Sequence, residues 1–362
     1  MYSKLLFWFL YVMISGYFMK NKKSLIKTVL PLFFIAAAIA FVFLYKQPKK
    51  KIIYSKEALI MGTTFRMEFS HADSKKAIVL EDKVVKEIKR LEKKLSPYIN
   101  DSEISIINRQ AAIAPVKVSV EMLELLQFAL EMGEKTDGVF DISYASVGRY
   151  YDFRSKKAPN TNIIQEKLKA INYKNIILNK ADSSVSFISK ECRINLGGFA
   201  KGYAAEVTAK ILKQGDADYG QITIGGDTYL FGRKYGKNGW RIGIKNPDRP
   251  KEAAILIQTT DSAVSTSGNY ERFFFKNGER IHHIINPKTG KSAKGIKSVT
   301  IIGKSGAMCD ALSTTLLISG EQKGLALINS IPDYEAIMIT DDDRVITSNN
   351  ANKFIVIGIE KQ

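Results

Sequence analysis

The chain has 362 residues, of which 45% are hydrophobic and 25% charged, a composition typical of a globular protein with a sizeable core. Its net charge of +18 would suit a nucleic-acid-binding protein, but nine lysines and no acid lie in residues 1–51, which leaves +9 for the other 311 residues. We interpret that surplus as surface solvation with some attraction to acidic lipid or a phosphate ligand, and expect no nucleic-acid partner.

An apolar segment precedes the body of the chain. Residues 28–45 carry no charge and are long enough to span a bilayer, with Lys27 and Lys46 on either side. A cleaved signal peptide is the alternative, because a charged stretch begins at Met19, but no small-x-small cleavage site follows. We therefore favour an uncleaved signal anchor that leaves the body outside the cytoplasm.

A second apolar run covers residues 5–19. It would form a two-span hairpin with a cytoplasmic body, or it belongs to an upstream extension with Met19 as the true start, which we prefer. We accordingly divide the chain into an extension at residues 1–18, an anchor with a basic linker at 19–52, and one folded domain at 53–362.

Helices and strands alternate irregularly along this domain. Apolar periodicity predicts helices at residues 77–95, 120–136, 162–170, 204–212, 307–318 and 322–329. Strands are predicted within 54–69, at 176–178, 185–188, 221–224, 229–232, 240–244, 254–258, 262–266, 273–275, 298–303, 335–340 and 354–357. Because no regular βαβ rhythm appears, we predict an α+β fold of mixed, largely antiparallel sheets with packed helices.

The most informative motif is the glycine-rich run from Asn195 to Glu206. Gly197 and Gly198 permit a tight turn between a strand and a helix, and Lys201 stands where the helix opens. A helix start with a lysine is suited to an anion such as phosphate, although the spacing is not that of a Walker P-loop. The simpler alternative is an ordinary turn with a surface lysine.

A second motif contains Asp310 and Thr314, which lie on one face if the segment is helical. A carboxylate and a hydroxyl form an oxygen-ligand set suited to Mg²⁺. The alternative is that Asp310 caps the start of the helix.

The histidines provide one candidate base. We place His71 in a polar loop and expect it to be inert. His282 and His283 are adjacent, so in a strand they face opposite ways, and one could enter a site while the other is solvated. A structural role near the Asn286–Gly290 turn is the alternative to catalysis.

Several common site motifs are absent from the sequence, including the Gly-x-Ser-x-Gly elbow, the HExxH zinc motif and the GxGxxG fingerprint. Cys192 and Cys309 have neither zinc-site nor redox-motif spacing, so we predict buried thiols, with a disulfide left open. The remaining inventory favours the handling of a nucleotide pyrophosphate over acyl or hydride transfer.

Eight motifs in order resemble the ApbE family, the Mg²⁺-dependent FAD:protein FMN transferases, over residues 54–360. They are Met61-Gly62-Thr63, Tyr98 with Asp101-Ser102-Glu103, Thr136–Asp141, Asn195–Lys201, Gly225-Gly226-Asp227, Ser265–Tyr270, His283–Gly290 and Asp310–Thr314. The resemblance implies the transferase fold for residues 53–362, and FAD and Mg²⁺ as substrate and cofactor.

The resemblance also implies a role for each matching residue. An FAD pocket would be lined by Met61, Tyr98, Val139, Phe140, Asp141, Asn195, Lys201 and Ile284. Mg²⁺ would be bound by the Gly198 carbonyl, Asp310 and Thr314, with Ser313 as a further ligand. The catalytic residues would be His283 as base, with Lys201 and Asp310.

Four positions depart from the family pattern. Asn195 and Asn286 stand where the family often has acids, which reduces negative charge near the cofactor. Ile142-Ser143 replaces a usual Pro-Thr pair, which affects the pocket rim.

The implied reaction is attack of a Thr or Ser hydroxyl of a partner protein on the FMN phosphorus, with release of AMP. The family's acceptors are flavin-bearing subunits of membrane redox complexes of the Nqr and Rnf kind, on the periplasmic side of the bacterial inner membrane. The alternatives are an FAD pyrophosphatase that yields FMN and AMP, and a non-catalytic flavin-binding protein.

Overall fold

The computed structural model describes residues 35, 51–249 and 251–357. Two predicted segments lie outside the described residues: the extension at residues 1–18 and, except for Ile35, the anchor run at residues 28–45. Among the residues described, no helix is both long and apolar enough to cross a membrane. The chain divides into two units, Met1–Lys51 and Ile52–Gln362, and the second contains the helices and strands of the folded domain.

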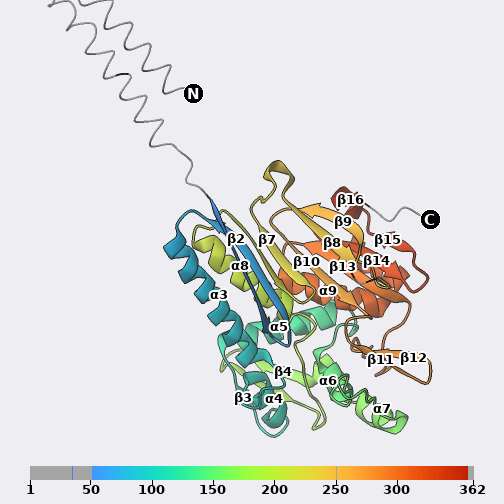
Figure 1. Cartoon of the computed structure of the whole chain (residues 1–362). Coiled ribbons are helices and arrows are strands. Elements are labelled where there is room, and N and C mark those ends of the chain that lie inside the picture. The colour runs from blue at the N-terminus through green and yellow to red at the C-terminus, as the bar shows by residue number, and fades with distance from the viewer. Residues whose placement is uncertain (1–34, 36–50, 250, 358–362) are drawn as a thin grey trace, which may run out of the picture. The chain divides into compact units, whose positions relative to one another are not determined.

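The centre of this unit is an eight-stranded antiparallel sheet with the order β1-β2-β6-β7-β10-β13-β14-β15 (Figure 1). Its strands are β1 (Ile52–Ile60), β2 (Thr63–His71), β6 (Tyr219–Ile224), β7 (Asp227–Phe231), β10 (Ser262–Gly268), β13 (Ile296–Gly303), β14 (Glu335–Thr340) and β15 (Val345–Thr347). The prediction of a mixed α+β fold with largely antiparallel sheets is therefore confirmed.

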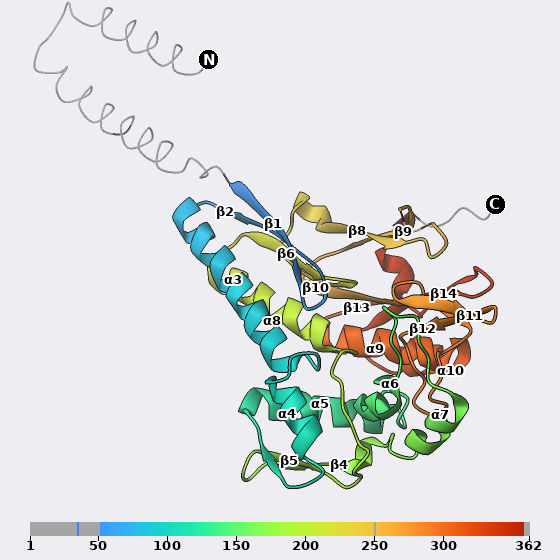
Figure 2. The ribbon, with the colours of Figure 1, turned by 60° about the horizontal axis from the view of Figure 1, so that its bottom comes forward.

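Both faces of the sheet are covered. Helices α3 (Ser74–Leu95), α8 (Ala200–Gln214), α9 (Gly306–Ser319) and α10 (Glu321–Asn329) cover one face (Figure 2). Strands β8 (Trp240–Lys245), β9 (Ala253–Thr259) and β16 (Ile355–Ile357) form a second sheet that packs around Trp240. Successive side chains of β13 point to opposite faces of the large sheet. Ile301 therefore belongs to the core under the helices, and Ile302 to the core between the two sheets.

The remaining elements lie beyond one end of the large sheet (Figures 1 and 2). They are α4 (Glu103–Gln110), α5 (Val120–Lys135), α6 (Ala145–Gly148), α7 (Thr161–Leu168), the sheet of β3 (Val116–Lys117), β5 (Ser184–Phe187) and β4 (Ile176–Asn179), and the hairpin of β11 (Phe273–Lys276) and β12 (Glu279–His282). The hairpin turns at Asn277 and Gly278, both at positive φ, as its Asn-Gly pair predicts.

Side-chain caps set the helix starts. Ser102 caps α4 by accepting from the Ser105 amide. Ser305 caps α9, and Asp310 therefore lies inside the helix and does not cap it. The alternative role considered for Asp310 is thus wrong.

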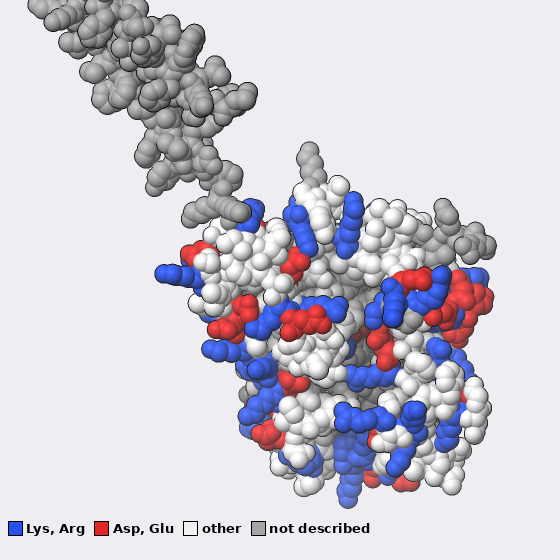
Figure 3. All heavy atoms as spheres, viewed as in Figure 1, with Lys and Arg blue, Asp and Glu red and all other residues white. Residues whose placement is uncertain are grey.

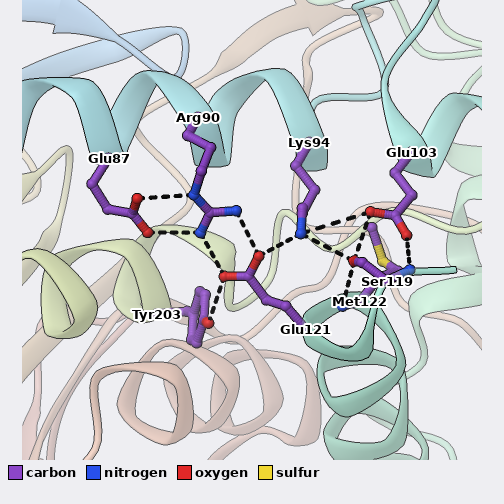
Figure 4. A network of polar contacts seen from close by, with 8 residues as sticks. All are labelled: Glu87, Arg90, Lys94, Glu103, Ser119, Glu121, Met122 and Tyr203. Atoms are coloured by element: carbon purple, nitrogen blue, oxygen red, sulfur yellow. Dashed lines mark hydrogen bonds and ion pairs between the residues drawn. The ribbon is translucent and has the colours of Figure 1, made fainter.

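A charged network holds the helices on the site side together (Figure 4). Glu121 of α5 accepts from Arg90 of α3 at 2.7 Å, from Lys94 of α3, and from Tyr203 of α8 at 3.0 Å. Hydrogen bonds from Arg90 hold the pKa of Glu121 at about 2, well below its usual range. This network anchors the first turns of α8, which carry the glycine–lysine motif.

His71 does not lie in a polar loop, as predicted. It is the last residue of β2 and is buried, with Nδ1 at 2.8 Å from the Asp73 amide nitrogen and Nε2 at 3.2 Å from the Gly215 carbonyl oxygen. Its ring therefore joins the end of the strand to the loop that follows α8.

Candidate functional site

The site is organised around Lys201, in the first turn of α8. Its Nζ lies 2.8 Å from an Asp227 oxygen at the start of β7 and 3.5 Å from an Asp310 oxygen on α9. Both carboxylates are only 2% exposed. Burial alone would lower the pKa of Lys201, but the two carboxylates outweigh it and raise that pKa, so the ammonium is charged. The alternative of a surface lysine on an ordinary turn is excluded.

Two buried carboxylates share this one ammonium. Burial and repulsion by Asp227 raise the pKa of Asp310 above its usual range. When both carboxylates are ionised, the pair carries one more negative charge than Lys201 balances, and a further cation beside Asp310 would offset it.

A close crossing of α8 and α9 places Asp310. A Cβ on Gly202 would lie 2.1 Å from the Gly306 carbonyl oxygen, and one on Gly306 would lie 2.2 Å from the Gly202 carbonyl oxygen. Only glycines allow the two backbones to approach so closely. At this distance the Gly202 amide donates to Asp310 at 3.0 Å. Glu206, one turn later on α8, accepts from the Ser305 hydroxyl and the Gly306 amide at the start of α9.

The predicted metal ligands gather near this crossing. Thr314 lies one turn after Asp310 on α9, and its hydroxyl is 3.2 Å from that of Ser267 on β10. The Ser313 hydroxyl is 2.8 Å from Ser267 Oγ but donates to the Asp310 carbonyl at 2.9 Å. In a regular helix the Gly202 amide would donate to the Gly198 carbonyl, but here it donates to Asp310. Among the residues the structure describes, no donor bonds to the Gly198 carbonyl.

These donors are all oxygen atoms, which suits a hard cation such as Mg²⁺ that keeps several waters. Within the described ranges no group of three or more His, Cys, Asp and Glu side chains could hold a metal. The charge excess at Asp310 and the free Gly198 carbonyl nevertheless fit a Mg²⁺ ion held by one carboxylate, a carbonyl and a hydroxyl.

His283 follows β12 and is largely enclosed. Its Nδ1 is buried without a partner, its ring meets that of Phe153 edge-on at 6.4 Å, and its amide donates to the Arg272 carbonyl. Burial and the charge of Arg272 lower its pKa to about 3, so the imidazole is neutral at physiological pH. His282 is buried and bonds to the Ala293 carbonyl at 2.8 Å, so it is not solvated, contrary to one expectation.

Phe140 and Val139 lie beside the glycine turn. Phe140 is buried, with its ring centroid 6.3 Å from that of Phe199, and it lies 3.2 Å from where a Cβ on Gly198 would be. Val139 precedes it and is half-buried. Asp141 is buried and accepts from the Ser143 amide, the Ser143 hydroxyl and the Tyr173 amide. Asp141 therefore holds the shape of this loop.

Met61 and Tyr98 lie at the margin of the site. Met61 forms the β1–β2 turn at a φ of 55°, and its amide donates to Glu92 of α3 at 2.7 Å. Tyr98 is 84% exposed and lies close enough to Tyr144 to influence the pKa of that phenol, which burial raises to about 12. An exposed aromatic ring at this position is available to stack on a ligand.

The other predicted contacts with FAD are placed by local hydrogen bonds. Asn195 accepts from the Gly197 amide at 2.7 Å, so it shapes the glycine turn. The amide of Asn195 donates to the Ile142 carbonyl, which connects the turn to the loop of Asp141. Ile284 is buried next to His283, and Asn286 accepts from the Lys288 amide within its turn.

Four site residues were missing from the sequence-based list, namely Asp227, Ser267, Arg272 and Tyr144. Asp227 and Ser267 stood inside motifs that were recognised, at the ends of two strands, and that position was the available signal. Arg272 donates to the Gly62 carbonyl at 3.2 Å, and its charge acts on both His283 and Tyr144. No sequence pattern placed Arg272 or Tyr144 beside Lys201.

The two cysteines lie apart from this chemistry. Cys192 and Cys309 are free and buried, as predicted, and burial raises the pKa of each thiol. Neither thiol forms a disulfide.

Comparisons with known proteins show the family of this chain. The model of the ApbE family matches residues 61–338. An FAD:protein FMN transferase from Treponema pallidum (strain Nichols) is 29% identical over 313 residues, which cover 82% of this chain and 86% of that protein. The crystal structure of the ApbE protein from Thermotoga maritima is 29% identical with a TM-score of 0.77, covering 84% of this chain and 99% of that one. The flavin transferase ApbE from Vibrio cholerae is 25% identical with a TM-score of 0.73, covering 84% and 99%.

Proposed function

Because this chain belongs to the ApbE family, we propose that it transfers the FMN part of FAD to a Thr or Ser hydroxyl of a partner protein and releases AMP. The observation that carries the proposal is the ammonium of Lys201, held between two buried carboxylates at the start of α8. A fixed cation at a helix start is suited to a pyrophosphate, because both the lysine and the helix amides attract negative charge.

The bond to be broken lies between the two phosphates of FAD. Lys201 neutralises charge on the pyrophosphate, and Arg272, which lies by the Gly62 carbonyl, adds a second cation on the His283 side. The exposed ring of Tyr98 supplies apolar surface for the rings of FAD, and the buried ring of Phe140 packs against the glycine turn. Binding and orientation account for much of the catalysis expected in phosphoryl transfer.

Asp310, Thr314 and the Gly198 carbonyl would hold Mg²⁺, with Ser313 as a further ligand. When bound, Mg²⁺ supplies charge neutralisation to the pyrophosphate and to the leaving phosphate of AMP. Among these ligands Asp310 carries the only charge, so its side chain contributes most to the affinity for the ion.

His283 is suited to act as the general base. Its imidazole is neutral, and because Nδ1 is buried, Nε2 is the nitrogen left to accept a proton from the acceptor hydroxyl. The hydroxyl oxygen forms a bond to the FMN phosphorus, the bond from that phosphorus to the oxygen of the AMP phosphate breaks, and AMP leaves with that oxygen. If water replaces the hydroxyl, the same groups hydrolyse FAD to FMN and AMP.

We propose that the apolar run at residues 28–45 anchors the folded domain on the periplasmic side of a bacterial inner membrane. Acceptors there would be flavin-bearing subunits of membrane redox complexes of the Nqr and Rnf kind. The charged residues on either side of the run support an anchor.

One assay tests the proposal. The full chain is incubated with FAD, MgCl₂ and a flavin-free subunit of such a complex, and AMP and protein-bound flavin fluorescence are measured. We expect both products in equal amounts, and an Asp310→Ala variant should lose AMP release by roughly 100-fold or more. AMP without flavin on the acceptor would identify a hydrolase. An undiminished rate in the Asp310→Ala variant would overturn the metal assignment, with Asp82→Ala, on the exposed face of α3, as the control.

A further inference from the structure

The positive charge of the folded unit is concentrated in two segments, residues 148–194 and 272–294, which we call the basic lobe. They contain 16 Lys and Arg but only 5 Asp and Glu, a net charge of +11. The rest of residues 52–362 contains 29 Lys and Arg and 31 Asp and Glu, a net charge of −2. The whole excess of the unit therefore belongs to the basic lobe.

The two segments form one surface. The Tyr151 hydroxyl donates to the Gly290 carbonyl at 2.8 Å, and the rings of Phe153 and Phe274 lie 5.9 Å apart. Gly290 itself lies against Ile164 of α7. Figure 3 shows Lys and Arg side chains gathered over the lower part of the molecule, where Figure 1 places α6, α7 and the β11–β12 hairpin.

The acidic side chains of the basic lobe already have ion-pair or hydrogen-bond partners. Glu279 pairs with Lys294 at 2.7 Å, Glu166 and Glu191 pair with Lys167, Asp182 pairs with Lys117, and Asp152 accepts from the Arg154 and Ser155 amides. Several exposed cations, by contrast, have no carboxylate within ion-pair distance in the described part of the chain. They are Arg154, Lys156, Lys157, Lys276 and Lys291.

His283 itself lies within the second segment of the basic lobe. The loop of residues 152–157 contains Phe153, whose ring contacts that of His283. The β11–β12 hairpin ends at His282, the residue before His283. On the hairpin, Arg280 lies over the rings of Phe273 and Phe275, at 4.7 and 5.6 Å from their centroids. Phe275 is 62% exposed, and the hairpin forms a sheet of its own two strands among the described residues.

We propose that the basic lobe is the docking surface for an acidic segment of the polypeptide that carries the acceptor hydroxyl. The proposal rests on the proposed function, since it names the partner of the same site. Three features fit a polypeptide: unpaired cations for its carboxylates, exposed aromatic rings for its side chains, and a short hairpin whose outer edge can pair with an extended backbone. Because His283 lies within the basic lobe, docking there brings a hydroxyl to the base.

Binding of a labelled peptide tests this directly. The probe is a fluorescein-labelled peptide with one threonine flanked by Asp and Glu, and its anisotropy is measured with the full chain at low and moderate salt. The test variant combines Lys157→Glu, Lys276→Glu and Lys291→Glu. The matched control combines Lys83→Glu, Lys86→Glu and Lys89→Glu on the exposed face of α3, with the same change in charge. Both keep the lysines of residues 1–51, whose contribution cancels in the comparison.

We expect the lobe variant to bind the peptide at least ~10-fold more weakly than the α3 variant, and added salt to weaken binding by the wild type. Equal affinities in the two variants would overturn the proposal. A second result would also overturn it: a lobe variant that keeps peptide binding but no longer sediments with phosphatidylserine vesicles. The partner of the basic lobe would then be a lipid surface. AMP release from FAD without peptide should be unchanged in both variants. If the wild type released no AMP from FAD, the proposed function would be wrong. The peptide-binding result would still decide whether the basic lobe is a docking surface.

Discussion

At the residue scale, the site depends on how burial changes the charge state of a few side chains. His283 has a folded pKa of about 3, below its usual value of 6.5, so it stays neutral throughout the neutral range. Its neutral form favours the folded state above pH 6.5, and that contribution is lost as the pH falls toward 3. An imidazole that is unprotonated at physiological pH can accept a proton, and the negative charge of a bound pyrophosphate would raise its low pKa toward the range that suits a general base.

Replacement of His283 tests this role. We expect His283→Gln to lower kcat for FMN transfer by roughly 100-fold to 10,000-fold, with little change in the KM for FAD, because the base acts only in the transition state. Steady-state AMP release measures both constants. His71→Gln is the control, since within the described ranges that ring bonds only to the Asp73 and Gly215 backbone, and its loss should lower Tm without lowering kcat. Equal kcat values in wild type and His283→Gln would remove His283 from the reaction.

At the scale of elements, the crossing of α8 and α9 decides where the ligands lie. Gly202 and Gly306 bring the two backbones together, and this contact sets Asp310 beside both Lys201 and the Gly202 amide. A wider crossing would separate the carboxylate from its partners. The two glycines are therefore part of the site although neither presents a side chain.

A single methyl group tests the crossing. Gly202→Ala would place a Cβ 2.1 Å from the Gly306 carbonyl oxygen, so the helices must separate. We expect a loss of roughly 2 to 4 kcal/mol in the free energy of unfolding and a loss of Mg²⁺-dependent AMP release, measured by urea unfolding and by the FAD assay. Gly324→Ala on α10 is the matched control, because its Cβ would have no neighbour closer than 3.4 Å, and it should be tolerated. Full activity in Gly202→Ala would show that the contact is dispensable.

At the scale of the whole molecule, one sheet separates two cores, and ion pairs join the helices on one side to the elements around the site. Glu121 is the centre of that connection, with Arg90 and Lys94 on α3 and Tyr203 on α8 (Figure 4). Its pKa of about 2 lies below the usual 4.5, so the folded state binds fewer protons than the unfolded state between these values. The contribution of Glu121 is therefore complete above pH 4.5 and is lost as the pH falls toward 2.

Acid unfolding of the whole unit should report this contribution. We expect Glu121→Gln to lower the free energy of unfolding at pH 7 by about 1 to 2 kcal/mol, a value reduced for partial solvent screening. The difference from wild type should shrink between pH 4.5 and 2, as followed by urea unfolding across that range. Glu57→Gln, in an exposed pair with Arg66, should change stability by less than about 0.5 kcal/mol at any pH. A difference that stays constant down to pH 2 would contradict the assignment.

The family and most elements of the fold could be predicted from the sequence. The predicted helix at residues 307–318 is α9 (Gly306–Ser319), and the predicted strand at 298–303 lies within β13 (Ile296–Gly303). Both follow from local patterns, because apolar spacing and turn residues act within a few positions of the chain. The resemblance to the ApbE family rested on motifs in order and is confirmed by the match over residues 61–338.

The arrangement of charges was decided only by the tertiary structure. Lys201 is separated from Asp227 by 26 positions and from Asp310 by 109, and no local pattern reports a distance between such residues. The same holds for the neutral state of His283, which depends on burial and on the charge of Arg272. The sequence by itself determined the family and most of the helices and strands. The packing of α8 against α9 determined the distances and charge states of Lys201 and Asp310, because both depend on contacts between distant parts of the chain.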